Sequence, residues 1–210
     1  RQSLFCIFMT IVHKLFRKYF KNQYLRVFAG GLMLVLLNIV LKTTDYNGTG
    51  MNIIAKALNG DAQPAAFLLK ALFTAITIGC GFRGGEIVPS FFVGATFGCV
   101  AGGLMGMDPG FAAALGMVCF FCGVVNCPLT SLFLSIELFG ANGIMFFTIG
   151  CAVSYMLSGY YSLYNEQKII YSKLRPHYVN LYTNQEIRTK EPGFLEGFLR
   201  IREDDADDVE

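Results

Sequence analysis

The segment from Ala65 to Leu163 carries only five charged residues, which are Lys70, Arg83, Glu86, Asp108 and Glu137. A soluble domain carries a charge at about every fourth position, because its surface must be hydrated. This segment has no such surface, and 54% of the whole chain is hydrophobic. The sequence therefore predicts a membrane protein built from helices, since a helix satisfies its own backbone polar groups in lipid.

The apolar runs of this chain differ in length. A transmembrane helix needs about 20 mostly apolar residues. The candidate spans are 24–41, 65–79, 87–107, 111–136 and 138–157. The first is short, the second contains Lys70, and the fourth is interrupted at Pro128. We therefore predict an all-α, polytopic membrane protein in which several helices are tilted or broken.

The strongest interruption is a glycine-rich stretch between two apolar runs. Glycines stand at positions 79, 81, 84 and 85, and Pro89 follows them. Proline is well tolerated in the first turn of a helix, so we predict an unwound stretch and then a helix beginning near Pro89. In lipid, irregular backbone survives only where it is buried in protein or lines a polar cavity. Because a helix start offers unpaired N–H groups with about half a positive charge, the expected ligand is a dehydrated anion.

Basic residues flank the apolar region on both sides. Residues 1–26 contain six lysines and arginines and no acidic residue, and Lys168, Lys173 and Arg175 follow the last apolar run. Basic flanks stay on the cytoplasmic side, so we expect an integral protein of the plasma membrane with both ends in the cytoplasm. Because these basic residues adjoin membrane spans, the sequence argues against a nucleic-acid partner.

Composition divides the chain into three parts. Residues 1–23 form a basic cytoplasmic linker, 24–171 the transmembrane domain, and 172–210 a polar tail whose end, 203–210, is mostly acidic. Such a tail is expected to be solvated and partly disordered, and it has too few apolar residues for a second domain. The first residue is Arg1 rather than methionine, so we expect an upstream portion in the native protein.

The sequence shows no constellation for catalysis or for metal binding. The histidines, His13 and His177, lie in the flanks, and six of the seven cysteines fall in apolar segments, where cysteine behaves as a small hydrophobic residue. An acid–base pair of Glu86 and Glu137 would require both carboxylates to face one water-filled cavity. We therefore expect a protein that is not an enzyme and that holds no metal and no cofactor.

Polar residues within the apolar runs need partners. Lys70, Thr74 and Thr77 share one face of a helix, and an ammonium near mid-membrane costs roughly 2.5–3.5 kcal/mol. Lys70 is therefore expected to have a partner or a wet cavity, and both a structural pair and a place beside an ion path fit the sequence. For the same reason Glu137 is expected to pair within the protein or to cap a neighbouring helix.

Glycines recur at every fourth position of the run that Pro89 precedes. They are Gly94, Gly98, Gly102 and Gly106. On a helix they form a flat stripe that lets another backbone approach closely. Close packing within the chain is favoured over a contact between subunits.

Three segments of the chain occur in an informative order. They are GGEIVP at 84–89, NCPLT at 126–130 with Glu137 after it, and SLY at 162–164. In this order they resemble the GGxFxP motif, the APLT helix with its glutamate, and the tyrosine segment of the CLC family of chloride channels and chloride/proton antiporters. The resemblance covers most of residues 20–175.

The resemblance implies a homodimer in the lipid bilayer, in which each subunit consists of two inverted halves and holds its own anion pathway. This chain is similar to the second half together with the final helix. The implied function is chloride transport, as a channel or as an anion/proton antiporter. By correspondence with the family motifs, the anion-binding residues are Gly85, Glu86, Ile87, Val88 and Tyr164, with Tyr161 as second choice for the tyrosine.

Two departures from the family pattern leave alternatives open. The serine loop and the gating-glutamate loop of the family belong to its first half and do not occur in this sequence, so proton coupling is undecided. Glu86 stands where an anion should sit: an ionised carboxylate would repel the anion, whereas a protonated one can donate a hydrogen bond or pass a proton. Glu86 and Lys70 are accordingly the candidates for a proton or ion path.

The same departures suggest two other functions. Glu86 resembles the fluoride/proton-exchanging branch of the family, although Val88 differs from the threonine of that branch. The first alternative is therefore a fluoride/proton antiporter. The second is a truncated half that does not transport by itself and only associates with partners in the membrane.

Overall fold

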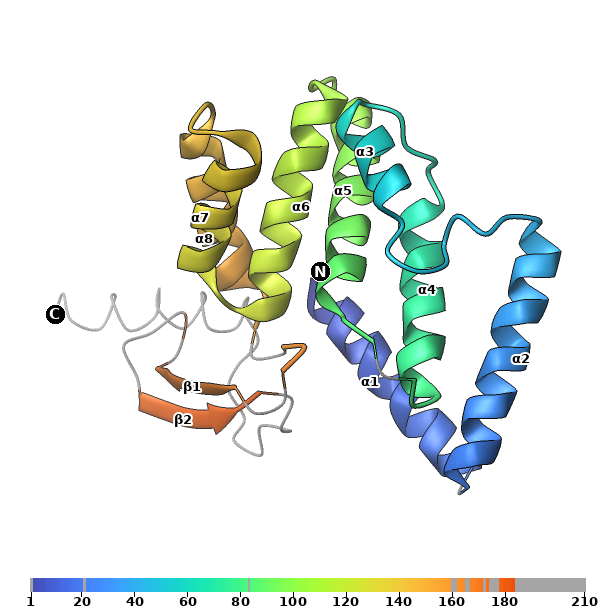
Figure 1. Cartoon of the computed structure of the whole chain (residues 1–210). Coiled ribbons are helices and arrows are strands. Elements are labelled where there is room, and N and C mark those ends of the chain that lie inside the picture. The colour runs from blue at the N-terminus through green and yellow to red at the C-terminus, as the bar shows by residue number, and fades with distance from the viewer. Residues whose placement is uncertain are drawn as a thin grey trace, which may run out of the picture.

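The computed structural model describes residues 2–20, 22–82, 84–159, 162–164, 167–171, 173 and 178–183. Within these ranges the chain forms eight α-helices and one two-stranded sheet (Figure 1). The helices are α1 (Gln2–Tyr19), α2 (Gln23–Leu41), α3 (Met51–Leu58), α4 (Ala66–Gly79), α5 (Ile87–Leu104), α6 (Pro109–Val125), α7 (Pro128–Phe139) and α8 (Ile144–Leu157). The strands are β1 (Lys168–Tyr171) and β2 (Tyr178–Tyr182). The expected helical architecture is confirmed, with this hairpin as an addition.

The break between the second and third apolar runs lies where the sequence predicts it. α4 ends at Gly79, the backbone turns at Gly81 with φ of 94°, and α5 begins at Ile87. Pro89 is the third residue of α5 rather than the first. Proline is tolerated anywhere in this turn, because the N–H groups of the first turn have no helical acceptor and none is lost. A second break, at Asn126 with φ of 60°, separates α6 from α7 and divides the fourth apolar run.

Few of the described helices are long enough to cross a membrane by themselves. Among the described residues, α2 and α5 are long and apolar enough to cross a membrane, whereas α4, α6, α7 and α8 are apolar but shorter. α1 fills most of the predicted linker, and α3 forms in a segment where the sequence predicted no helix. The uneven lengths agree with the expected mixture of full spans and half-helices.

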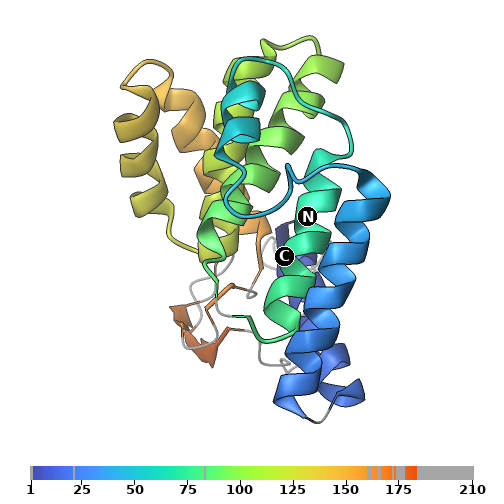
Figure 2. The same cartoon turned by 45° about the vertical axis from the view of Figure 1, so that its right-hand side comes forward.

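α5 and α6 form the centre of the molecule (Figures 1 and 2). α3 and α4 lie on one side of this pair, α7 and α8 lie on the other, and α2 stands at the outer edge beside α4. α1 packs against α4 and α6. Clusters of buried side chains fill the spaces between these layers. Residues 84–85 of the break before α5 are exposed, whereas Pro89 and Ser90 in the first turn of α5 are buried.

The glycine stripe explains how closely α5 and α6 pack. A Cβ atom at Gly94 would lie 2.7 Å from Gly116 O, and one at Gly116 would lie 2.7 Å from Gly98 Cα. Gly98 meets the backbone of Ala112 in the same way. Gly106 lies beyond the end of α5 and faces open space. Close packing within the chain is therefore confirmed, with Gly106 as the one stripe position outside it.

The C-terminal hairpin crosses the predicted boundary between the transmembrane domain and the tail. Its strands are antiparallel, with Lys168 opposite Tyr182 and Tyr171 opposite Tyr178. Both strands are rich in β-branched and aromatic residues, which favour extended backbone. The acidic end of the tail, 203–210, lies outside the described residues.

Candidate anion-binding site

The start of α5 presents backbone amides that have no helical partner. Residues 84–85 are glycines in non-helical conformation, and a side chain at either position would meet nothing within 4 Å. The first backbone bond of the helix runs from Ser90 N to Glu86 O at 3.2 Å, so the amides of Ile87 and Val88 lie ahead of it. These amides, with the positive end of the helix dipole, can donate to an anion.

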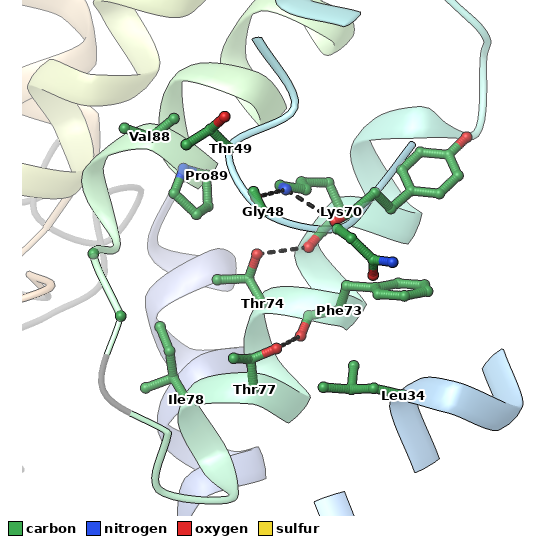
Figure 3. Close-up of a pocket in the computed structure, with 14 residues that line it drawn as sticks. Leu34, Gly48, Thr49, Lys70, Phe73, Thr74, Thr77, Ile78, Val88 and Pro89 are labelled. Carbon is green, nitrogen blue, oxygen red and sulfur yellow. Dashed lines mark hydrogen bonds between the residues drawn. The ribbon is translucent and has the colours of Figure 1, made fainter. Parts of the chain in front are cut away.

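A cavity of about 450 Å³ lies beside this helix start (Figure 3). Figure 3 shows Val88 and Pro89 of α5 on one side of it and Lys70, Thr74 and Thr77 of α4 on another. Residues 84–85, Leu34 of α2 and the loop before α3 complete the wall. The polar face of α4 predicted from the sequence is thus adjacent to the predicted anion-binding segment. Gly85 and Val88 line the cavity, whereas Glu86 and Ile87 do not.

Lys70 is buried in the wall of this cavity, with 2% of its surface exposed. Its Nζ donates to the carbonyl oxygens of Gly48 at 2.6 Å and Tyr46 at 3.0 Å, and lies 5.1 Å from the centre of the Phe92 ring. Both expected features, a partner and a cavity, are therefore present. The partners are carbonyls rather than a carboxylate, so these contacts leave the positive charge of Lys70 uncompensated beside the cavity.

Glu86 caps the start of α5 and is half-buried. Its side chain makes no capping hydrogen bond to the helix. Cys6 belongs to a buried cluster that also contains Val93 of α5 and Val124 of α6. Glu86 is not among the residues that line the cavity beside Lys70.

Tyr164 lies in an irregular segment after α8, and 45% of its surface is exposed. Leu163 beside it donates its backbone N–H to Val124 O at 3.1 Å and packs on the cluster that contains Cys6. Among the described residues, no contact joins Tyr164 directly to residues 84–88. Tyr161, the second choice for the tyrosine, lies outside the described residues.

The structure also reveals contacts around Tyr164 that no motif indicated. Thr183 Oγ1 donates to Tyr164 O, and Lys173 Nζ donates to Asn126 Oδ1 and Ser158 Oγ. Lys173 and Thr183 are ordinary polar positions in the tail predicted to be solvated. The sequence carries no signal for them, because their roles depend on how the hairpin folds back.

Glu137 does not make the expected internal contact within the described residues. It is exposed on α7, close to the exposed apolar residues Phe133 and Leu138. The sequence predicted a pair or a helix cap because lipid exposure of a carboxylate is costly. A second surface that covers this face of α7 would shield the carboxylate from lipid.

Comparison with known proteins points to the same family as the sequence motifs do. The profile of the voltage-gated chloride channel family matches residues 3–159. The chain belongs to this family. A chloride/fluoride channel protein of Pseudomonas syringae pv. tomato is 33% identical over 176 residues, which cover 80% of this chain and 39% of the relative.

Other members of the CLC family show the same partial coverage. An H(+)/Cl(-) exchange transporter ClcA of Vibrio vulnificus is 26% identical over 148 residues, covering 64% of this chain and 32% of the relative. The crystal structure of a CLC-type fluoride/proton antiporter is 33% identical with a TM-score of 0.74, covering 78% of this chain and 42% of that chain. The chain therefore spans about two fifths or less of the length of these relatives.

Proposed function

We propose that this chain is the anion-binding half of a proton-coupled halide transporter. The observation that carries the proposal is the free helix start of α5, with its amides at Ile87 and Val88, beside a cavity that contains the buried charge of Lys70. The anion is bound by these amides and by the hydroxyl of Tyr164. Such neutral donors replace part of the hydration shell of the ion.

Fluoride is the favoured substrate, in place of the chloride expected from the sequence. Glu86 at the helix cap resembles the fluoride/proton-exchanging branch, and the structure of a CLC-type fluoride/proton antiporter is 33% identical to this chain. The chloride exchanger of Vibrio vulnificus is 26% identical. Chloride remains the second candidate, because the relative from Pseudomonas syringae carries both ions in its name.

Removing the Tyr164 hydroxyl should weaken anion binding without unfolding the protein. We expect Tyr164→Phe to lose about 0.5–1.5 kcal/mol of binding free energy, or up to about 3 if the charge of the ion strengthens the bond. The measurement is fluoride and chloride efflux from liposomes containing the protein at its native length, with affinity measured by calorimetry. Lys70→Met is the second variant, and should slow efflux by removing the positive charge beside the cavity.

Tyr24→Phe provides the matched control, because Tyr24 is highly exposed on α2 and far along the chain from the site. It should transport both ions like the wild type. Unchanged anion affinity in Tyr164→Phe would remove this tyrosine from the site. Absence of efflux of either ion from the native-length protein would favour the alternative of a half that only associates in the membrane.

The same proposal includes a homodimer formed through α7 and α8. These helices expose a broad apolar face, and the exposed carboxylate of Glu137 lies within it. A second subunit would cover the face and shield Glu137 from lipid. Light scattering on the purified protein should therefore give the mass of two subunits, and Glu137→Gln should not reduce it. A mass of one subunit at all concentrations would contradict this assembly.

A further inference from the structure

The C-terminal hairpin holds the backbone of Tyr164 from both sides. Tyr164 O accepts hydrogen bonds from Gln167 N at 3.3 Å and from Thr183 Oγ1. Thr183 follows β2 directly, is 2% exposed, and donates its own N–H to Gln167 O at 2.9 Å. Before the hairpin, Ser162 Oγ accepts from Tyr164 N at 3.3 Å and donates to Gln167 Oε1 at 2.8 Å. The position of Tyr164 therefore depends on the hairpin remaining folded against it.

Lys173 attaches the hairpin to the ends of two helices. Its Nζ donates to Ser158 Oγ at 2.6 Å and to Asn126 Oδ1, and lies 4.4 Å from the centre of the Tyr155 ring. Asn126 caps the C-terminus of α6 and Ser158 caps that of α8, and both are buried. A partly buried, charge-assisted hydrogen bond of this kind contributes more than an exposed one. The ammonium thus joins the hairpin to the central helix α6.

A separate contact joins the residue before Tyr164 to α6. Leu163 N donates to Val124 O, two residues before Asn126 on α6. The Tyr164 segment is therefore fixed to α6 on its N-terminal side through Leu163, and on its C-terminal side through the hairpin and Lys173. A tyrosine on an irregular loop needs such support, because a loop without it loses the fixed geometry that ion binding requires.

We propose that Lys173 is a positioning residue that holds Tyr164 at the anion site by anchoring the C-terminal hairpin to the ends of α6 and α8. The proposal rests on the anion-binding role of Tyr164 given above. It assigns to the hairpin, strands β1 and β2 with Lys173 between them, a part in ion affinity, although the hairpin contains none of the residues proposed to touch the ion.

Anion affinity is the first measurement that tests this role. Sodium fluoride and sodium chloride are titrated by calorimetry into the native-length protein, as wild type and as Lys173→Met. We expect Lys173→Met to weaken binding by about 3- to 10-fold, and by no more than Tyr164→Phe does. Lys173→Arg should restore part of the loss, because a guanidinium keeps the charge, the donors and the stacking on Tyr155. Lys56→Met, an exposed position on α3, should bind like the wild type.

A double-mutant cycle separates positioning from a general structural effect. If Lys173 acts through the Tyr164 hydroxyl, adding Lys173→Met to Tyr164→Phe should not weaken binding further. Equal losses in both backgrounds would overturn the proposal, because Lys173 would then act independently of Tyr164. Unchanged affinity in Lys173→Met, while Tyr164→Phe binds more weakly, would overturn it and leave the proposed function intact. Unchanged affinity in Tyr164→Phe would overturn the positioning role and remove Tyr164 from the site, while efflux from the native-length protein would still test the transporter function separately.

Thr183→Val tests the same chain of contacts if Lys173→Met does not fold. Valine has the shape of threonine but cannot donate to Tyr164 O, so it removes one contact from the hairpin side. We expect weaker anion binding with an unchanged melting temperature, and again no additional loss on top of Tyr164→Phe. Wild-type affinity in Thr183→Val would contradict the dependence of Tyr164 on the hairpin.

Discussion

Replacing Gly98 with valine should prevent the protein from accumulating in a folded form. A Cβ atom at this position would overlap the carbonyl oxygen of Ala112 and lie 3.0 Å from Gly116 Cα. Both are backbone atoms of α6, so neither can move aside as a flexible side chain would. We expect a loss of at least about 3 kcal/mol, at the upper end of the cost of overpacking a core. The amount of monodisperse protein extracted from membranes measures this effect.

Gly103→Ala is the control for this prediction. Gly103 belongs to the same helix, but a Cβ atom there would meet nothing within 4 Å. Alanine should therefore be tolerated, and should stabilise α5 by about 0.5–1 kcal/mol, since glycine is a weak helix former. If both variants were recovered in wild-type amounts, the contact between α5 and α6 would not be as close as the structure shows. If both were lost, helix insertion rather than packing would be responsible.

Glu86→Gln should abolish the dependence of anion transport on pH. Glu86 is half-buried at the cap of α5, next to the amides that are proposed to bind the ion. An ionised carboxylate at this point opposes the anion, whereas a protonated one does not, so the proton and the anion are coupled through its charge. Glutamine has nearly the same shape but does not titrate. The variant should therefore bind fluoride and transport it passively, without moving protons.

The measurement is fluoride efflux from liposomes with the external pH recorded at the same time, at acidic and at neutral pH. The wild type should move protons against fluoride, and Glu86→Gln should not. Asp61→Asn, an exposed carboxylate in the loop before α4, should behave like the wild type. Equal pH dependence in the wild type and Glu86→Gln would remove Glu86 from the proton path while leaving the anion site intact.

Local sequence features determined the membrane nature of the chain and the position of its broken helix. The scarcity of charge between Ala65 and Leu163 excludes a hydrated surface, and the glycines at 79–85 with Pro89 exclude a continuous helix. These properties depend on residue type and spacing within one segment, so no distant contact was needed to predict them. The motif order at 84–89, 126–130 and 162–164 was likewise visible without coordinates, and it led to the family that the comparison then showed.

Contacts between distant segments were decided only by the tertiary structure. The sequence shows that Lys70 requires a partner, and the structure shows that its partners are the backbone carbonyls of Tyr46 and Gly48. Every residue has a backbone carbonyl, so no sequence pattern could identify these two. The tail predicted to be solvated contributes β2 to a hairpin, and its Lys173 donates hydrogen bonds to the C-terminal caps of α6 and α8. Burial of a single polar side chain depends on where the backbone returns, and that is settled by packing across the whole fold rather than by local composition.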